Sequence, residues 1–285
     1  MITTLLVDKR NFATILPQLQ TEVSSATFLG LDIETEDSNK HEGLVAYNKG
    51  RKGITFDQRR QVVCGISLYA DGSDTAYYIN LNHADIENRV PWAPIQELIE
   101  SRPTSCTILC HNAPFELTVL ANVYDYHPTN VVCTLQMCVS AYSPDEFSIS
   151  DFCGAGVGTM STILPAIYRA GATFQGDRNN MTPDQAKVFG QIVGKESDAA
   201  FSYNGFVNSI SYGYGLKKAV KSWFGHQMTT FKEVIGKRQH MGELTGEEVA
   251  SYGAEDSYWC VRLFHQLVAF MMKTNPQVLT TFLSQ

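Results

Sequence analysis

The 285-residue sequence lacks features that several classes of protein require. It has no run of about 18 apolar residues, which a membrane span needs, and no basic segment followed by an apolar signal core at its N-terminus. Basic residues are too few for a protein that wraps long nucleic acids, because 22 against 29 acidic residues give a net charge of -7. A short strand end held by a few contacts is not excluded. We therefore expect a cytoplasmic globular protein without a membrane partner.

Cysteine and histidine do not form a metal-binding pattern. The seven cysteines include no C-x-x-C pair, and Cys64, Cys106 and Cys110 lie in apolar segments typical of reduced core thiols. His111 stands alone and His226, His240 and His265 are scattered, so solvated or capping positions are expected for each of them. A zinc site built from these residue types is not indicated.

Apolar runs and helical spacing predict a mixed α/β sheet flanked by helices. We expect strands near residues 26–33, 62–69, 75–81 and 106–110, and helices near 92–101, 113–123 and 134–142. The polar segment 37–60 is predicted to be a loop. We expect a single domain over 1–285, with an extended insertion at about 143–213 and a linker-like tail from about 273.

Two carboxylates stand at the end of a predicted buried strand, in the stretch FLGLDIETED. Because side chains alternate along a strand, Asp32 and Glu34 project from one face and Leu31 and Ile33 from the other. The other D-x-E triplet, Asp85 to Glu87, follows no apolar strand and is predicted to be a solvated turn. The context of a buried strand therefore distinguishes the first triplet.

Two further acids fall on the core-facing sides of predicted helices. A capping box at Thr245 begins the C-terminal helix, and Asp256 lies on its apolar stripe one turn after Tyr252. Glu116 occupies the buried line of the helix in CHNAPFEL. Buried carboxylates that gather in one place repel each other unless cations lie between them, and oxygen ligands favour Mg²⁺ or Mn²⁺. Asp32, Glu34, Glu116 and Asp256 therefore indicate a site for divalent cations.

Taken in order, LDIET, CHNAPFEL and YGAED resemble the three exonuclease motifs of the DEDD superfamily, in the branch whose third motif is tyrosine, three residues, aspartate. Residues 215–237, GLKKAVKSWFGHQMTTFKEVIGK, are similar to the stretch before the third motif in the proofreading domain of family A DNA polymerases. The resemblance covers residues 26–142 and 214–272. It implies a ribonuclease H-like fold with a mixed five-stranded sheet, and removal of nucleotides from a DNA 3′ end with two divalent cations.

The resemblance also implies roles for individual residues. Asp32 is expected to bridge both metal ions, Glu34 and Asp256 to complete the tighter site, and Glu116 to serve the second ion. Tyr252 is expected to orient the attacking water. Asn112 and Phe115 are expected near the substrate strand. The family has aspartate where this chain has Glu116, so the second metal ion is either bound directly by the longer side chain or held in a distorted site.

A predicted helix carries Lys217, Lys218 and Lys221 before Trp223 and Phe224. Cations mixed with aromatic rings can follow a single strand, and a solvated helix face is equally compatible with the spacing. The resemblance favours nucleic acid.

Three hypotheses follow from the motifs. The first is a proofreading-type 3′–5′ exonuclease that acts on single-stranded or frayed DNA 3′ ends. It would be one subunit of a split DNA polymerase, a stand-alone nuclease or an excised domain. The second is an RNA-trimming exonuclease of the same superfamily. The third is a module that binds nucleic acid or a polymerase and whose catalysis the change at Glu116 has weakened. A compact, divergent replication nuclease of this kind would suit a bacteriophage.

Overall fold

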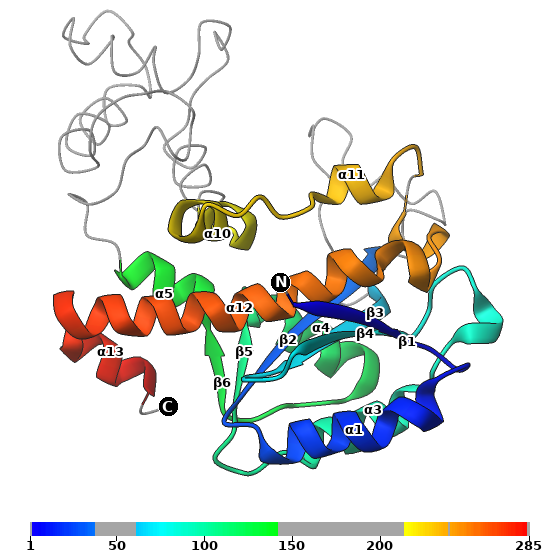
Figure 1. Cartoon of the computed structure of the whole chain (residues 1–285), viewed down its shortest axis with the longest axis horizontal. Coiled ribbons are helices and arrows are strands. Elements are labelled where there is room, and N and C mark those ends of the chain that lie inside the picture. Colours follow the sequence, from blue (N-terminus) through cyan, green and yellow to red (C-terminus); the bar gives the residue numbers. More distant parts are fainter. Residues whose placement is uncertain (1, 38–60, 142–213, 239, 284–285) are drawn as a thin grey trace, which may run out of the picture. The chain divides into compact units, whose positions relative to one another are not determined.

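A computed structural model describes residues 2–37, 61–141, 214–238 and 240–283 (Figure 1). The predicted loop before residue 61 and the predicted insertion at 143–213 lie outside the described residues. The chain divides into two units, one made of residues 1–136 and 227–285 and the other of residues 137–226. The first unit contains the sheet and every acidic candidate. In the second unit, the elements that the structure describes are the end of helix α5 (Thr134–Ala141) and helix α10 (Leu216–Phe224).

The first unit is built on one mixed sheet of six strands. They are β1 (Thr3–Val7), β2 (Phe28–Asp37), β3 (Gln61–Ala70), β4 (Thr75–Asn80), β5 (Thr107–Cys110) and β6 (Val131–Cys133), in the order β1-β4-β3-β2-β5-β6. Strand β3 is antiparallel to β2 and β4, and the other pairs are parallel. Strands β4, β3, β2, β5 and β6 have the order and directions of a ribonuclease H-like sheet. The predicted fold class is confirmed, and β1 adds a sixth strand to the five that were expected.

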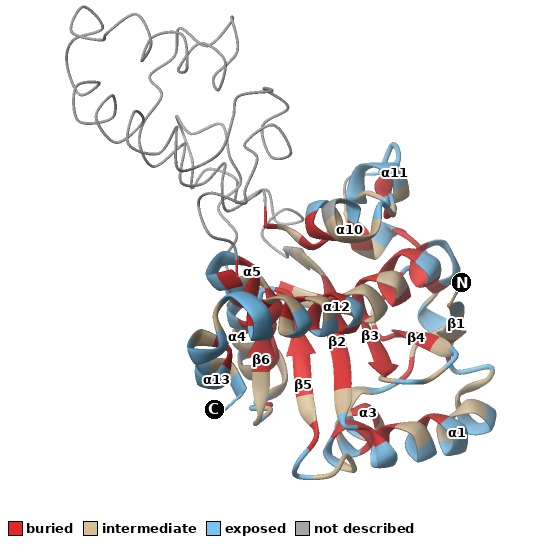
Figure 2. Cartoon of the chain, turned by 60° about the vertical axis from the view of Figure 1, so that its left-hand side comes forward, coloured by how far each residue is buried: buried red, intermediate tan, exposed pale blue. Residues whose placement is uncertain are grey.

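Helices cover both faces of this sheet. The helices of this unit are α1 (Phe12–Ser25), α3 (Trp92–Glu100), α4 (Ala113–Tyr124), α11 (Phe231–Ile235), α12 (Gly246–Thr274) and α13 (Pro276–Leu283), with the short 3-10 helices η3 (Ile86–Asn88) and η5 (Met241–Glu243). Helices α11 and α13 pack against α12. Buried residues of α1, α3 and α4 share a core cluster with Leu29, Leu31 and Ile33 of β2. Helix α12 contacts strands β1 to β5, and Figure 1 shows it lying along the sheet. The strands between these layers are largely buried (Figure 2).

The long helix α12 begins as the sequence predicts. The Thr245 side chain accepts the backbone N–H of Glu248, and the Glu248 carboxylate accepts the backbone N–H of Thr245 at 2.9 Å. This reciprocal pair satisfies N–H groups that a helix start otherwise leaves without partners. It fixes the position at which α12 starts, and the buried stripe of Val249, Cys260 and Leu263 sets which side of the helix faces the sheet.

The region expected to be a linker-like tail is largely helical. Helix α12 runs to Thr274 and α13 continues from Pro276, with Leu279 buried at 5% exposure. Val278, Leu279 and Phe282 recur at helical spacing, which gives α13 an apolar side to pack on α12. The sequence prediction missed this because the polar residues around Asn275 interrupt the pattern.

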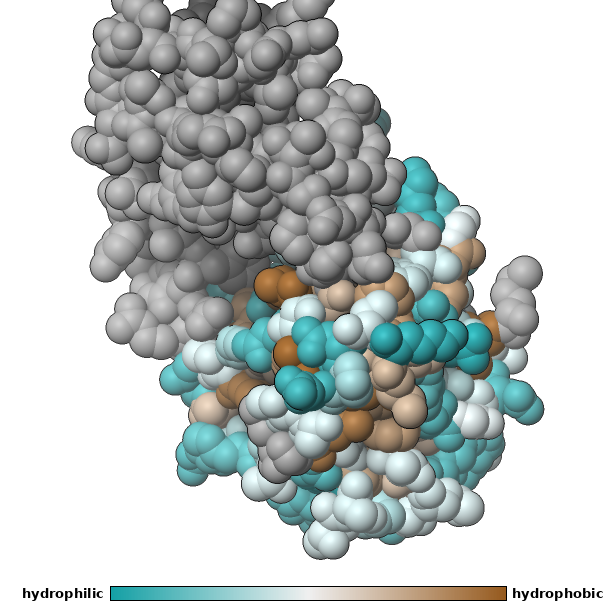
Figure 3. Space-filling model, turned by 90° about the vertical axis from the view of Figure 1, so that its left-hand side faces the viewer, coloured by the Kyte–Doolittle hydropathy of each residue, from teal (hydrophilic) through white to brown (hydrophobic). Residues whose placement is uncertain are grey.

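Surface and thiol features of the described residues agree with a folded domain. Figure 3 shows hydrophilic and hydrophobic side chains interspersed on the face turned to the viewer. Among the described helices, none combines the length and apolarity needed to cross a bilayer. Six cysteines are free and buried, including Cys64, Cys106 and Cys110, which confirms the prediction of reduced core thiols for these three.

Candidate active site

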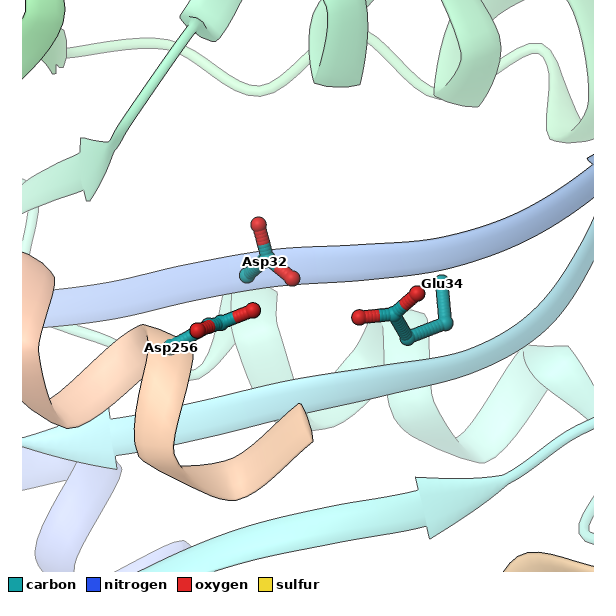
Figure 4. A group of neighbouring side chains, drawn as sticks. All are labelled: Asp32, Glu34 and Asp256. Carbon is teal, nitrogen blue, oxygen red and sulfur yellow. The ribbon is translucent and has the colours of Figure 1, made fainter. Parts of the chain in front are cut away.

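Three of the predicted carboxylates meet at the surface of the sheet. Asp32 and Glu34 come from β2 and Asp256 comes from α12, and one oxygen of each lies within 4.8 Å of the others. Figure 4 shows the three carboxylates turned toward a common space between the strand and the helix. Glu34 and Asp256 are 9% and 7% exposed, and Asp32 is half-buried. Residues separated by more than 200 positions in the chain therefore form one acidic cluster, as the sequence predicts.

A missing side chain allows the helix to approach the strand at this point. Gly30 is on the same face of β2 as Asp32, and a Cβ on it would overlap the carbonyl oxygen of Ser257 and lie 2.8 Å from Cγ2 of Val261. Any larger residue at position 30 would push α12 away from the sheet. Because Ser257 follows Asp256 directly, Gly30 sets how closely Asp256 can approach Asp32.

Tyr252 lies one helical turn before Asp256 and is 7% exposed. Burial raises the pKa of its phenol well above the ordinary value, and the negative charges of Glu34, Asp256 and Asp32 raise this pKa further. Its hydroxyl therefore keeps its proton at neutral pH. A protonated phenol beside three carboxylates can orient a water molecule by hydrogen bonding, and it cannot act as a base.

Glu116 is buried in the first turn of α4, where its exposure is 4%. Burial raises the pKa of its carboxyl to about 8, and its Oε2 atom has no hydrogen-bond partner within the described part of the chain. The charges of Glu116 and Asp32 both raise the pKa of the neighbouring thiols of Cys110 and Cys260. Glu116 is therefore close to the same thiols as Asp32, although its carboxylate is not part of the 4.8 Å cluster.

The other predicted residues occupy varied positions. Asn112 is exposed and occupies the N-cap position of α4, where its side chain makes no capping hydrogen bond. Its φ of 129° is a positive value that residues other than glycine rarely adopt. Phe115 is half-buried and packs against the core cluster. The lysines of α10 belong to the second unit, in which Lys218 and Lys221 are exposed and Lys217 is half-buried.

The second D-x-E triplet has a structural role. It forms η3, and the Asp85 Oδ1 accepts the backbone N–H of Gly246 at 2.9 Å, at the start of α12. Glu87, in contrast, is exposed. The triplet therefore helps to hold α12 in place, and its carboxylates take no part in the acidic cluster.

Two buried polar residues behind the cluster, Tyr78 and His83, were not among the sequence candidates. Both side chains have 0% exposure, and the Tyr78 hydroxyl lies 2.7 Å from Nε2 of His83. Tyr78 stands in a strand that is buried on both faces and His83 in a short polar loop, so neither carries a signal in the sequence. Only the packing of α12 on β3 and β4 brings them behind the site.

Known proteins resemble the chain in fold. No family model and no curated protein matches it. The match to Brucella melitensis NrnC covers 90% of this chain and 78% of NrnC, at 14% sequence identity and a TM-score of 0.43. The match to the EXO domain of Aedes aegypti Nibbler covers 98% of this chain and 99% of that domain, at 13% identity and a TM-score of 0.42. The match to Escherichia coli RNase D, an exoribonuclease involved in structured RNA processing, covers 79% of this chain and 47% of RNase D, at 12% identity and a TM-score of 0.33. Because one fold hosts many functions, the chemistry must come from this chain's own side chains.

Proposed function

We propose that the protein is a metal-dependent 3′–5′ exonuclease that removes nucleotides from single-stranded or frayed DNA 3′ ends. The observation that carries this proposal is the cluster of Asp32, Glu34 and Asp256, whose oxygens lie within 4.8 Å of one another beside the buried phenol of Tyr252. Phosphodiester hydrolysis by paired cations needs a set of carboxylates of this kind.

The donor atoms suit a divalent cation. Three carboxylates packed this closely repel one another, and a shared cation would relieve that repulsion. Carboxylate oxygens favour Mg²⁺ or Mn²⁺ over zinc. The buried Oε2 of Glu116 without a hydrogen-bond partner is a further donor that a cation would satisfy. These observations support Asp32, Glu34 and Asp256 as ligands of one ion and Glu116 as a ligand of a second.

Each side chain has a role in this proposal. When bound, the cations make hydroxide available near neutral pH and stabilise the leaving 3′ oxygen. Tyr252, which keeps its proton, orients the attacking water, and Glu34 assists by accepting a hydrogen bond from it. Asn112 and Phe115, at the start of α4, hold the terminal nucleotide. Lys217, Lys218 and Lys221 contact the phosphates of the strand.

The preference for DNA rests on the resemblance of residues 215–237 to the proofreading domains of family A polymerases. The carboxylates themselves do not read the sugar. Hydrolysis rates on matched DNA and RNA oligonucleotides decide between the two substrates. A clear preference for RNA would mean that RNA, and not DNA, is the substrate. A polymerase that copurifies with the protein or stimulates it would identify the expected partner.

The proposal is tested with a 3′-labelled oligonucleotide in Mg²⁺ and in Mn²⁺. Asp32→Ala and Asp256→Ala are expected to abolish digestion, whereas Glu87→Gln, which changes an exposed acid of the other D-x-E triplet, is expected to leave it unchanged. Undiminished digestion by either alanine variant would refute the proposal. Activity that is absent in the natural chain and appears only in Glu116→Asp would instead support a binding module.

A further inference from the structure

A buried tyrosine fills the space between strand β3 and the long helix α12. Tyr78 is on β4, has 0% exposure, and faces α12 from the sheet. A Cβ on Gly253, the residue after Tyr252, would overlap the ring of Tyr78. A Cβ on Gly65 of β3 would overlap its hydroxyl group. The ring of Tyr78 is therefore wedged between β3 and α12, in space that two glycines leave open.

The hydroxyl end of Tyr78 lies beside Glu34. Gly65 is the cross-strand partner of Glu34 in the antiparallel pairing of β2 and β3. Cβ positions in such a pair are about 4.5 to 5.5 Å apart, and the Tyr78 hydroxyl occupies the place of the absent Gly65 Cβ. The charge of Glu34 accordingly adds to the effect of burial in raising the pKa of Tyr78. Tyr78 thus borders both Glu34 and the turn of α12 that carries Tyr252.

A histidine fixes the orientation of this tyrosine. His83 is completely buried, and its Nδ1 lies 3.1 Å from the carbonyl oxygen of Leu244. A carbonyl oxygen only accepts, so Nδ1 carries the proton and the neutral ring offers Nε2 as an acceptor. Burial lowers the pKa of His83, which keeps the ring neutral. The Tyr78 hydroxyl therefore donates to Nε2 at 2.7 Å.

The same histidine connects the tyrosine to the start of α12. Leu244 immediately precedes Thr245, the N-cap of the helix, and its carbonyl oxygen also accepts the backbone N–H of Ala84 at 2.9 Å. The neighbouring Gly242 donates its N–H to Glu36 of β2 at 2.8 Å. The chain before α12 is therefore tied to the sheet at several points, and His83 is the one that reaches Tyr78.

We infer that Tyr78 and His83 form a positioning pair that holds Glu34 and Tyr252 in their working orientation, an inference that rests on the proposed exonuclease function. The pair touches neither substrate nor cation, and it acts through the side chains that do. Outer partners of metal ligands commonly contribute about 10- to 100-fold to metal affinity or activity. The Tyr78–His83 hydrogen bond is expected to contribute in this range.

Tyr77 provides a matched control. It is adjacent on β4, has 0% exposure, and projects to the opposite face of the sheet, where its hydroxyl donates to Glu22 Oε1 at 2.8 Å. Tyr77→Phe and Tyr78→Phe each remove one buried, hydrogen-bonded hydroxyl from the same strand. A merely structural role predicts similar effects of the two changes on activity. A positioning role predicts that only Tyr78→Phe affects turnover.

The histidine can be altered one nitrogen at a time. An asparagine at position 83 can place its amide near Nδ1 and keep the bond to Leu244, but it cannot reach Tyr78. A glutamine can place its amide oxygen near Nε2 and keep the bond from Tyr78. His83→Asn is therefore expected to behave like Tyr78→Phe, and His83→Gln to retain more turnover than His83→Asn.

The test measures kcat and KM on a short oligonucleotide, together with Mn²⁺ binding by calorimetry. Tyr78→Phe is expected to lower kcat by at least about tenfold with KM within about twofold, and to weaken Mn²⁺ binding, while Tyr77→Phe changes neither. Equal effects of Tyr77→Phe and Tyr78→Phe on kcat and on Mn²⁺ binding would overturn the inference. If the unaltered protein cleaves neither DNA nor RNA, the proposed function fails, and the Mn²⁺ titrations still decide whether the pair positions the ligands. If Tyr78→Phe does not fold, the comparison of His83→Asn with His83→Gln decides instead, and equal values for these two would also overturn the inference.

Discussion

Replacing Glu116 by glutamine should change how the stability of the metal-free protein depends on pH. Glutamine has nearly the same shape as glutamate but cannot ionise. Glu116 is 4% exposed, and burial raises the pKa of its carboxyl from 4.5 to about 8. The folded protein therefore holds this proton more tightly than the unfolded chain does. For the natural protein, the free energy of unfolding decreases as the pH rises from about 4.5 to about 8.

The size of this effect follows from the two pKa values. At 1.36 kcal/mol per pKa unit, ionising Glu116 in the folded state costs about 4 to 5 kcal/mol of stability at pH 8.5. The cost is close to zero below pH 4.5, where the carboxyl is protonated in both states. Glu116→Gln removes this pH-dependent cost. The variant should therefore become more stable than the natural protein as the pH rises.

Denaturant unfolding in the presence of EDTA, followed by tryptophan fluorescence, measures this difference. We expect the two proteins to differ little at pH 5, and the variant to be more stable by several kcal/mol at pH 8.5. Glu87→Gln is the control, because it removes an exposed carboxylate and should follow the natural protein at both pH values. If Glu116→Gln and the natural protein lose stability in parallel, then Glu116 is not a buried acid with a raised pKa and the reasoning fails.

Three other changes test the geometry of the site. Gly30→Ala should destabilise the protein by about 3 kcal/mol and weaken Mn²⁺ binding, because the alanine Cβ would overlap the Ser257 carbonyl and displace Asp256. An unchanged free energy of unfolding together with an unchanged Mn²⁺ titration would contradict this. Asn112→Gly should raise the melting temperature relative to Asn112→Ala, since glycine tolerates φ 129° and relief of such strain yields about 1 kcal/mol. Equal melting temperatures for these two variants would argue against strain at this cap. Tyr252→Phe should lower kcat by about 100-fold while Mn²⁺ binding stays within about twofold, because the phenol orients water and is not a ligand; weaker Mn²⁺ binding with kcat retained would reverse this assignment.

The periodic elements and their acids could be predicted from the sequence. The two-residue period of β2 places Asp32 and Glu34 on the same face of the strand. The helical period of α12 places Tyr252 and Asp256 on the same face of the helix. Both elements are long and strongly patterned. Since the same periods indicate which face is buried, they also indicate that these acids point inward.

Two elements at the start of the chain were not predicted from the sequence. Helix α1 carries Phe12, Ile15, Leu16, Leu19 and Val23 at helical spacing, and all five pack in or against the core. Pro17 and several serines and threonines, which are weak helix formers, lower its helix propensity. Strand β1 is an edge strand without a strong period, and of its residues only Val7 is fully buried. It forms because β4 offers it a parallel partner.

The close approach of α12 to β2 could not be predicted from the sequence either. The stretch around Gly30 shows a glycine in a strand, which indicates close backbone contact or a bulge without naming the partner. The hydrogen bond between Tyr78 and His83 joins two residues five positions apart through a loop. His83 also bonds to Leu244, 161 positions further along the chain, just before α12 begins. Such contacts are decided by tertiary packing, and they determine how accurately the acids meet.

The most direct test of the account is the position of a bound cation. In crystals soaked with Mn²⁺, we expect an anomalous peak in contact with carboxylate oxygens of Asp32, Glu34 and Asp256. Asp32→Ala should remove that peak, and Glu87→Gln should leave it in place. Crystals of the natural protein in which these carboxylates stay apart from any Mn²⁺ peak would contradict the account.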